Sequence, residues 1–172
     1  RDSDLYKDLQ FFESNFGGVM PFEIIVDTRD TNAINKLYFM NKIQRLQSEL
    51  ALYPEFSESI SYINLVKYAN QAYKNEGEKY YVLPQQMDLP RISSIIRKSE
   101  INDNLGFKLK DDINSKARVT LRMEDISTPR MDEIVSDLQP KVDEIFPSPQ
   151  YNVTITGSSM VFLEGTKFLV VN

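Results

Sequence analysis

The stretch from Lys116 to Gly157 constrains the fold of this chain more than any other, because its apolar residues change period twice. In 116–124 every second residue is apolar, which is typical of a strand with one buried face. The side chains predicted to be buried are Ala117, Val119, Leu121 and Met123. Ser127-Thr128-Pro129 then predicts a helix start, with a hydroxyl group for the cap and proline in the first turn.

After Pro129 the apolar residues return at helical spacing, so a helix is predicted that ends before Pro147. Its buried stripe is predicted to be Met131, Ile134, Leu138, Val142 and Ile145. Tyr151–Thr156 alternates once more and is closed by Gly157, which predicts a second strand. The apolar faces of such a strand, helix and strand can bury one another, so the stretch is predicted to form one βαβ unit.

A comparable unit comes earlier in the chain. Phe22–Asp27 is predicted to be a strand, and Asp30-Thr31-Asn32 is predicted to cap a helix that Pro54 ends. The apolar stripe of this helix is Ile34, Leu37, Met40, Leu46 and Leu50. Phe56–Ile63 is predicted to return as a weaker, serine-rich strand. Two βαβ units in tandem predict an α+β fold, a ferredoxin-like split βαβ arrangement with helices on one face of an antiparallel sheet.

The remaining segments complete a single predicted domain of 172 residues. Residues 1–18 contain a predicted helix, Ser3–Asn15, which Gly17-Gly18 ends. Residues 19–63 and 115–157 are the two βαβ units, and 64–114 is a helical insert between them. Residues 158–172 are predicted to be a further helix that leads into an apolar environment, because many of its residues are large and apolar.

Within the insert, Asn64 is predicted to cap a helix that Gly77 interrupts. Tyr80–Pro84 is predicted to be extended, Leu89–Lys98 to be a helix, and Ile101–Asp112 to be a loop. The three aromatic side chains Tyr80, Tyr81 and Phe107 lie in a stretch that is too irregular to bury all of them. They are the candidate substrate-contacting residues, although packing of the insert onto the sheet explains them equally well.

Composition excludes several classes of function. The chain has no cysteine and no histidine, which excludes disulfides, thiol nucleophiles, the usual zinc sites and histidine-based triads. The net charge is −5 and the basic residues are dispersed, so nucleic-acid binding is not expected. Because the first residue is Arg1 and not methionine, we expect the chain to be part of a longer protein.

Neighbouring carboxylates do not indicate catalysis. Asp111-Asp112 and Asp132-Glu133 are adjacent in sequence, but acid–base chemistry needs two groups held in a cleft with separated pKa values. We therefore expect no catalytic residues, no metal site and no cofactor. Charged residues are instead predicted to pair across the outer sheet face, where Glu23, Ile25 and Asp27 would face Arg118, Thr120, Arg122 and Glu124.

Four groups of residues, taken together, indicate a family. The first two are Asn15-Phe-Gly-Gly-Val-Met-Pro-Phe-Glu23, and Tyr53–Ser61 with Leu65-Val66. The other two are Ala117–Asp125 followed by Thr128-Pro-x-Met-Asp132, and Tyr151–Gly157 followed by Phe162-Leu-x-Gly-Thr166. They resemble the first extracytoplasmic loop of exporters of the resistance-nodulation-division (RND) superfamily, in the MMPL-like branch. The resemblance follows most of the chain in order and is weakest over Glu76–Asn114.

The resemblance implies an extracytoplasmic, periplasmic porter domain of a proton-driven exporter in the inner (cytoplasmic) membrane. Its partners would be the transmembrane helices and a second porter loop of the same transporter, and its substrate a hydrophobic or amphiphilic compound. The acidic residues that carry protons in such transporters lie in the membrane, outside this segment. The resemblance also implies that Arg1 and Asn172 lie close together on the side that faces the membrane.

Two other classes of function remain open at this point. One is a stand-alone ligand-sensing module of ferredoxin-like fold, which a closed apolar pocket and a stable dimer would favour. The other is a small hydrolase that holds phosphate with arginine and asparagine. That hydrolase would need an arginine beside a glycine-rich loop at the end of a strand, and the sequence contains no such arrangement.

Overall fold

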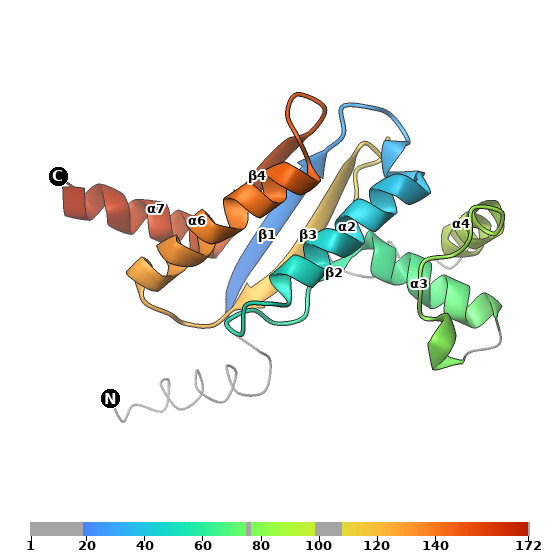
Figure 1. Ribbon diagram of the computed structural model, residues 1–172, viewed down its shortest axis with the longest axis horizontal. Helices are drawn as coiled ribbons and strands as arrows, with labels where there is room; N and C mark the ends of the chain where they lie inside the picture. The colour runs from blue at the N-terminus through green and yellow to red at the C-terminus, as the bar shows by residue number, and fades with distance from the viewer. Residues whose placement is uncertain (1–18, 75–76, 99–107, 172) are drawn as a thin grey trace.

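A computed structural model describes residues 19–74, 77–98 and 108–171. For residues 170 and 171 it describes the backbone and not the side chains. It is a mixed α/β fold built on one antiparallel sheet (Figure 1). The strands are β1 (Met20–Asp27), β2 (Ile60–Ser61), β3 (Lys116–Met123) and β4 (Asn152–Thr156). The helices are α2 (Leu37–Leu50), α3 (Tyr62–Tyr73), α4 (Leu89–Lys98), α6 (Thr128–Ile145) and α7 (Ser158–Val171). Two short 3-10 helices are η1 (Ala33–Asn35) and η2 (Glu78–Tyr80).

The strands of the sheet lie in the order β2-β3-β1-β4. In the centre Ile24 of β1 is opposite Val119 of β3 on one side and Ile155 of β4 on the other. All three strand pairs are antiparallel. The two strands of each unit therefore run in the same direction and are separated by a strand of the other unit.

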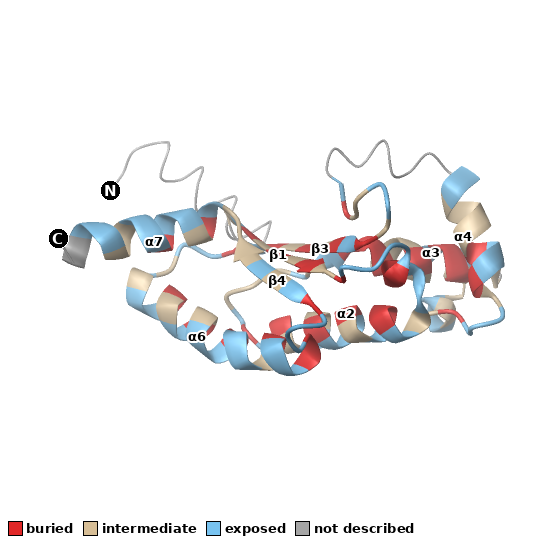
Figure 2. Ribbon diagram, turned by 90° about the horizontal axis from the view of Figure 1, so that it is seen from above, coloured by how far each residue is buried: buried red, intermediate tan, exposed pale blue. Residues whose placement is uncertain are grey.

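The core lies between the sheet and the two helices α2 and α6, which run side by side across one face (Figures 1 and 2). The alternation and the helical stripes predicted for β3 and α6 are confirmed, since every residue predicted to face the core there is buried. On β1 the inward residues are Phe22, Ile24 and Val26, all fully buried. Burial of each such side chain stabilises the fold by roughly 1.5–3 kcal/mol.

The start of α6 also follows the sequence pattern. The hydroxyl oxygen of Ser127 accepts a hydrogen bond from the backbone N–H of Arg130, and Pro129 lies in the first turn. Pro140 lies inside the helix, where it cannot donate a backbone hydrogen bond. The helix continues past it because Leu138 and Val142 bury its stripe on either side.

The predicted start of the first long helix is wrong. Asp30-Thr31-Asn32 leads into η1, and α2 begins only at Leu37, after an extended Lys36. Asn32 has a φ of 62° and its side chain makes no capping hydrogen bond. Its amide oxygen instead accepts a hydrogen bond from Asn114, at 3.2 Å, so a contact distant in sequence replaces the local cap.

The predicted strand Phe56–Ile63 is also wrong in extent, because only Ile60 and Ser61 form β2. Ser61 is the N-cap of α3 and forms a capping box with Asn64. Asn64 is therefore the third residue of this helix and not its cap. The capping box turns the chain into a helix before the strand can lengthen.

The outer edge of β3 is covered by three separate pieces of chain. Thr120 is opposite Ile60 of β2, and the backbone N–H of Ser57 donates to the carbonyl of Arg122 at 2.9 Å. At the other end, Arg118 donates its backbone N–H to the carbonyl of Leu109, also at 2.9 Å. Irregular segments on both sides of the short β2 thus cover the rest of the edge of β3.

The insert forms a pair of helices at one end of the sheet (Figure 1). The predicted helix Leu89–Lys98 is confirmed as α4, with Ile92 buried. The extended run predicted for Tyr80–Pro84 begins instead inside the 3-10 helix η2. Of the loop predicted for Ile101–Asp112, residues 101–107 lie outside the described residues, and Lys110 makes an antiparallel bridge with Ala117.

The predicted terminal helix is confirmed as α7, which lies at the end of the sheet opposite to α3 and α4 (Figures 1 and 2). The predicted helix Ser3–Asn15 and both Arg1 and Asn172 lie outside the described residues. In the described part of the chain, no helix has the length and apolarity that crossing a membrane requires.

Candidate functional site

The outer sheet face, opposite to α2 and α6, carries the predicted pairing of Arg118 with Glu23, whereas Asp27 pairs with Lys116, which was not among the residues predicted to face it. Arg118 lies 3.7 Å from Glu23, and Lys116 lies 3.5 Å from Asp27, each pair joining β3 to β1. The side chains are partly exposed, so each pair contributes at most about 1 kcal/mol. This face is therefore polar and structurally paired.

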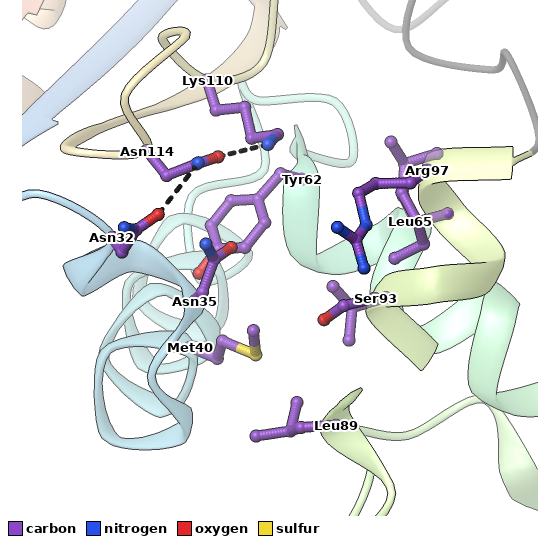
Figure 3. Close-up of a pocket in the computed structure, with 12 residues that line it drawn as sticks. Asn32, Asn35, Met40, Tyr62, Leu65, Leu89, Ser93, Arg97, Lys110 and Asn114 are labelled. Carbon is purple, nitrogen blue, oxygen red and sulfur yellow. Dashed lines mark hydrogen bonds between the residues drawn. The ribbon is translucent and has the colours of Figure 1, made fainter. Parts of the chain in front are cut away.

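A cavity of about 320 Å³ lies between the insert and the region where α2 begins (Figure 3). One wall comes from α3 and α4, and the other from η1, α2 and the turn before β3. The residues that line it are Asn32, Asn35, Met40, Tyr62, Leu65, Val66, Leu89, Ser93, Ile96, Arg97, Lys110 and Asn114. The walls thus combine segments that are far apart in the sequence.

Polar contacts hold α3 and α4 in place around this cavity. The side-chain amide of Asn70 donates to the carbonyl oxygens of Tyr80 and Val82, at 3.0 and 3.1 Å. Arg91 donates to the hydroxyl of Tyr73 at 2.8 Å, which connects the two helices directly. Asn70 therefore holds the segment that connects α3 to α4, and Arg91 holds the two helices next to each other.

The inner part of the cavity is apolar. Met40 contributes from α2, Val66 from α3, and Leu89 from the first turn of α4, and all three are buried. Tyr62 adds its ring, while its hydroxyl donates to the backbone carbonyl of Ile34. Burial raises the pKa of Tyr62 well above its ordinary value, so this hydroxyl stays protonated and serves to fix the ring.

A chain of side chains forms the polar wall. The ammonium of Lys110 donates to the amide oxygen of Asn114, whose amide nitrogen donates to Asn32 (Figure 3). Burial lowers the pKa of Lys110, and the neighbouring Asp111 and Asp112 oppose this shift only in part. The cation is therefore desolvated where it faces the cavity, and a nearby negative charge would stabilise it.

The last turn of α4 supplies a second cation. Arg97 and Ser93 point from α4 into the space between the walls (Figure 3). In the described residues no carboxylate lies within ion-pair distance of Arg97, and no aspartate or glutamate lines the cavity. The cavity thus has an apolar interior and a positively charged rim, which fits an anion, and its described lining residues offer no carboxylate to a divalent cation.

The substrate-contacting residues predicted from the sequence lie elsewhere. Tyr80 is half-buried in η2, and Tyr81 is 42% exposed and accepts a hydrogen bond from Asn64 at 3.2 Å. Tyr81 borders another surface pocket, of about 330 Å³, together with Gln47 and Phe56. Phe107 lies outside the described residues. Neither tyrosine lines the cavity between the insert and the start of α2, and these predictions remain untested as substrate contacts.

The residues that form the charged rim were not predicted as a site. The sequence explains Arg97 as a structural residue, because a basic side chain in the last turn of a helix interacts favourably with the helix dipole. Asn32 and Asn114 both have positive φ, a conformation that asparagine tolerates in turns. These signals identify turns and helix ends, but they do not indicate which ends meet.

The two carboxylate pairs considered from the sequence take part in structural contacts. Asp111 accepts hydrogen bonds from the backbone and hydroxyl of Ser115, both at 2.7 Å. Asp132 pairs with Lys167 of α7 at 2.5 Å, and Glu133 with Arg130 at 3.2 Å. In the part of the chain that the structure describes, no cluster of three or more acidic residues is placed to hold a metal ion.

The helix α7 exposes a second kind of surface. Leu163 is fully buried against the rest of the fold, whereas Phe162 and Leu169 are 54% and 79% exposed. Val161 and Phe168 are also exposed, so apolar side chains occur around much of the helix surface.

Compared with protein-family models, with curated proteins and with solved structures, the chain has no significant match.

Proposed function

We propose that this chain is an extracytoplasmic porter-type domain of a proton-driven membrane exporter in the MMPL-like branch of the RND superfamily. Its role there is to capture hydrophobic or amphiphilic compounds and to pass them on. The observation that carries the proposal is the cavity between the insert and the start of α2, which joins an apolar interior to a polar rim. Such a combination is typical of sites that bind small molecules.

The order of the strands in the sheet also supports the proposal. The strand order β2-β3-β1-β4, with each unit's strands separated by a strand of the other unit, is the order expected of a ferredoxin-like split βαβ arrangement. Such a sheet, covered by α2 and α6 on one face, leaves room at its end for an insert that builds a binding cavity. We propose this classification together with the porter role.

The exposed apolar side chains of α7 support a neighbouring apolar partner. In the proposal this partner is the remainder of the same transporter, on the periplasmic side of the inner membrane. Val161 and Leu169 would then be covered in the complete protein, as exposed apolar groups of this size usually are. The porter role is non-catalytic, in keeping with a chain that has no histidine and no cysteine.

An efflux assay in the source cells tests the proposal. Leu65→Trp, introduced into the chromosomal gene, fills the cavity, and Leu52→Trp is the control because its side chain is 69% exposed away from the lining residues. We expect energised cells with the cavity substitution to accumulate a lipophilic fluorescent dye, and control cells to exclude it. Unchanged dye efflux after deletion of the gene, or recovery of the protein away from the membrane fraction, would contradict the exporter role.

The same cavity also favours a second candidate, a stand-alone ligand-sensing module. Such a module would bind its ligand without any membrane partner and would form a stable dimer. Analytical ultracentrifugation of the protein isolated from its source cells separates the two candidates. A detergent-free dimer supports the sensing module, and a detergent-dependent membrane complex supports the exporter.

A further inference from the structure

The charges around the cavity are unequal. Of the described residues that line it, Arg97 and Lys110 are cations, and none is an anion. The carboxylates nearest in sequence to Lys110 are already occupied. Asp111 accepts hydrogen bonds from Ser115 and Lys116, and Asp112 pairs with Lys108 at 3.2 Å. A ligand that enters therefore meets positive charge without a neutralising side chain among the lining residues that the structure describes.

The guanidinium of Arg97 is placed to hold the head of a ligand. It points into the space between the walls, and Ser93, one helical turn earlier, presents a hydroxyl on the same side (Figure 3). A guanidinium offers two parallel N–H donors, which match the two oxygens of a carboxylate or phosphate. The ammonium of Lys110, held by Asn114, lies on the facing wall.

The rest of the cavity suits an apolar tail. Met40, Val66 and Leu89 are 2%, 5% and 7% exposed and give the ligand no hydrogen-bonding partner. The volume of about 320 Å³ lies at the lower end of the range for small-molecule sites. A single chain of medium length fits this space, and a lipid with two acyl chains does not.

We infer that the cavity binds a single-chain anionic amphiphile, with its carboxylate or phosphate head at Arg97 and Lys110 and its tail against Met40 and Leu89. The inference names a ligand class for the site on which the proposed function rests. A cationic amphiphile would face Arg97 and Lys110 without a counter-charge. A small anion without a tail would leave the apolar wall in contact with water.

Calorimetric titration of the full 172-residue chain with four probes of ten carbon atoms each tests this inference. The probes are decanoate, decyl phosphate and decanol, with decylammonium as the probe of opposite charge. We expect the two anions to bind, decanol to bind at least about tenfold more weakly, and decylammonium not to bind. Preference for decanoate over decyl phosphate, or the reverse, identifies which head the site takes.

Matched variants on one helix locate the head. Arg97→Gln removes the guanidinium, and Lys98→Gln removes the next charge on α4, which does not line the cavity. We expect about a tenfold loss of decanoate affinity for Arg97→Gln, no change for Lys98→Gln, and no effect of either on decanol. Leu65→Trp should abolish binding of all probes.

Three results would overturn the inference: equal binding of decanoate and decanol, equal effects of Arg97→Gln and Lys98→Gln, or no binding of any probe. Circular dichroism of each variant separates a lost contact from a lost fold. Failure here, with dye efflux still dependent on the gene, would refute the ligand class and leave the exporter role standing. Anion binding without any efflux phenotype would refute the exporter role and leave the site.

Discussion

A Cβ atom at Gly157 would lie 2.4 Å from the backbone carbonyl oxygen of Pro21, and the glycine itself has a φ of +108°. The contact joins the turn between β4 and α7 to the first residues of β1. Nearby, the hydroxyl of Ser159 donates to the same carbonyl at 2.8 Å. The sharp turn into α7 thus depends on a position where any side chain would collide with backbone.

We predict that Gly157→Ala destabilises the chain by about 2–4 kcal/mol, since it combines backbone strain with a steric clash against backbone that cannot move aside. Gly165→Ala is the matched control because a Cβ there meets nothing within 4 Å, and it should stabilise α7 by up to about 1 kcal/mol. Urea unfolding followed by circular dichroism measures both. Equal effects of the two substitutions would contradict the role of Gly157.

The packing of α2 against the sheet gives a second prediction. Leu46 is fully buried, whereas Leu52, just beyond the end of the helix, is 69% exposed. We expect Leu46→Ala to lower the free energy of unfolding by about 2–5 kcal/mol, because it leaves a cavity in the core. Leu52→Ala should change it by less than about 0.5 kcal/mol. A loss at Leu52 as large as that at Leu46 would place the core elsewhere.

Asp111 makes the stability of the turn before β3 depend on pH. Partial burial alone would raise the pKa of Asp111, but hydrogen bonds from Lys116 and Ser115 outweigh it and lower the pKa below its ordinary value. Since the pKa is lower in the folded than in the unfolded chain, the stabilisation is complete above the unfolded value. It is lost as the pH falls through the folded value.

We therefore expect Asp111→Asn to cost about 1–2 kcal/mol of unfolding free energy near neutral pH. The difference from the unmodified chain should shrink below about pH 4, where the carboxyl group becomes protonated. Asp112→Asn is the control, because the side chain of Asp112 is 87% exposed in its pair with Lys108. Urea titrations at several pH values measure the difference, and a constant difference at all pH values would exclude the carboxylate as its cause.

On α7 the two faces of the helix should respond differently. Leu163→Ala removes a fully buried side chain and should destabilise the chain by about 2–4 kcal/mol. Leu169→Ala removes an exposed one and should leave stability within about 0.5 kcal/mol of the original. Thermal unfolding distinguishes them. Strong destabilisation by Leu169→Ala would mean that this surface is already packed against the isolated fold.

The elements that the sequence predicts correctly are those whose structure is determined by local patterns. β3 and α6 were predictable because each buries one face against a single layer, and the apolar period records that burial directly. The residues Phe56–Ile63 carried a strand-like pattern, but the capping box of Ser61 and Asn64 turned the chain after two paired residues. A cap signal four residues long thus outweighed a weak strand signal.

The cavity could not be predicted in the same way. Asn32 and Asn114 meet only because β1 and β3 are neighbours in the sheet, and no local pattern records that meeting. The same holds for Arg97, whose position is set by the packing of α4 against α3. Sequence patterns specify which face of an element is buried, whereas a site of this kind depends on which turns the tertiary fold brings together.

The way in which the outer edge of β3 is covered has a consequence for solubility. A long open strand edge offers a continuous row of backbone donors and acceptors to which a second molecule can add, and this is a common route to amyloid-like association. Here Ser57, the short β2 and Leu109 use that row in separate pieces, and Ser57 also presents its hydroxyl to the backbone N–H of Arg122 at 2.9 Å. The irregular segments beside β2 thereby protect the central sheet from intermolecular strand addition.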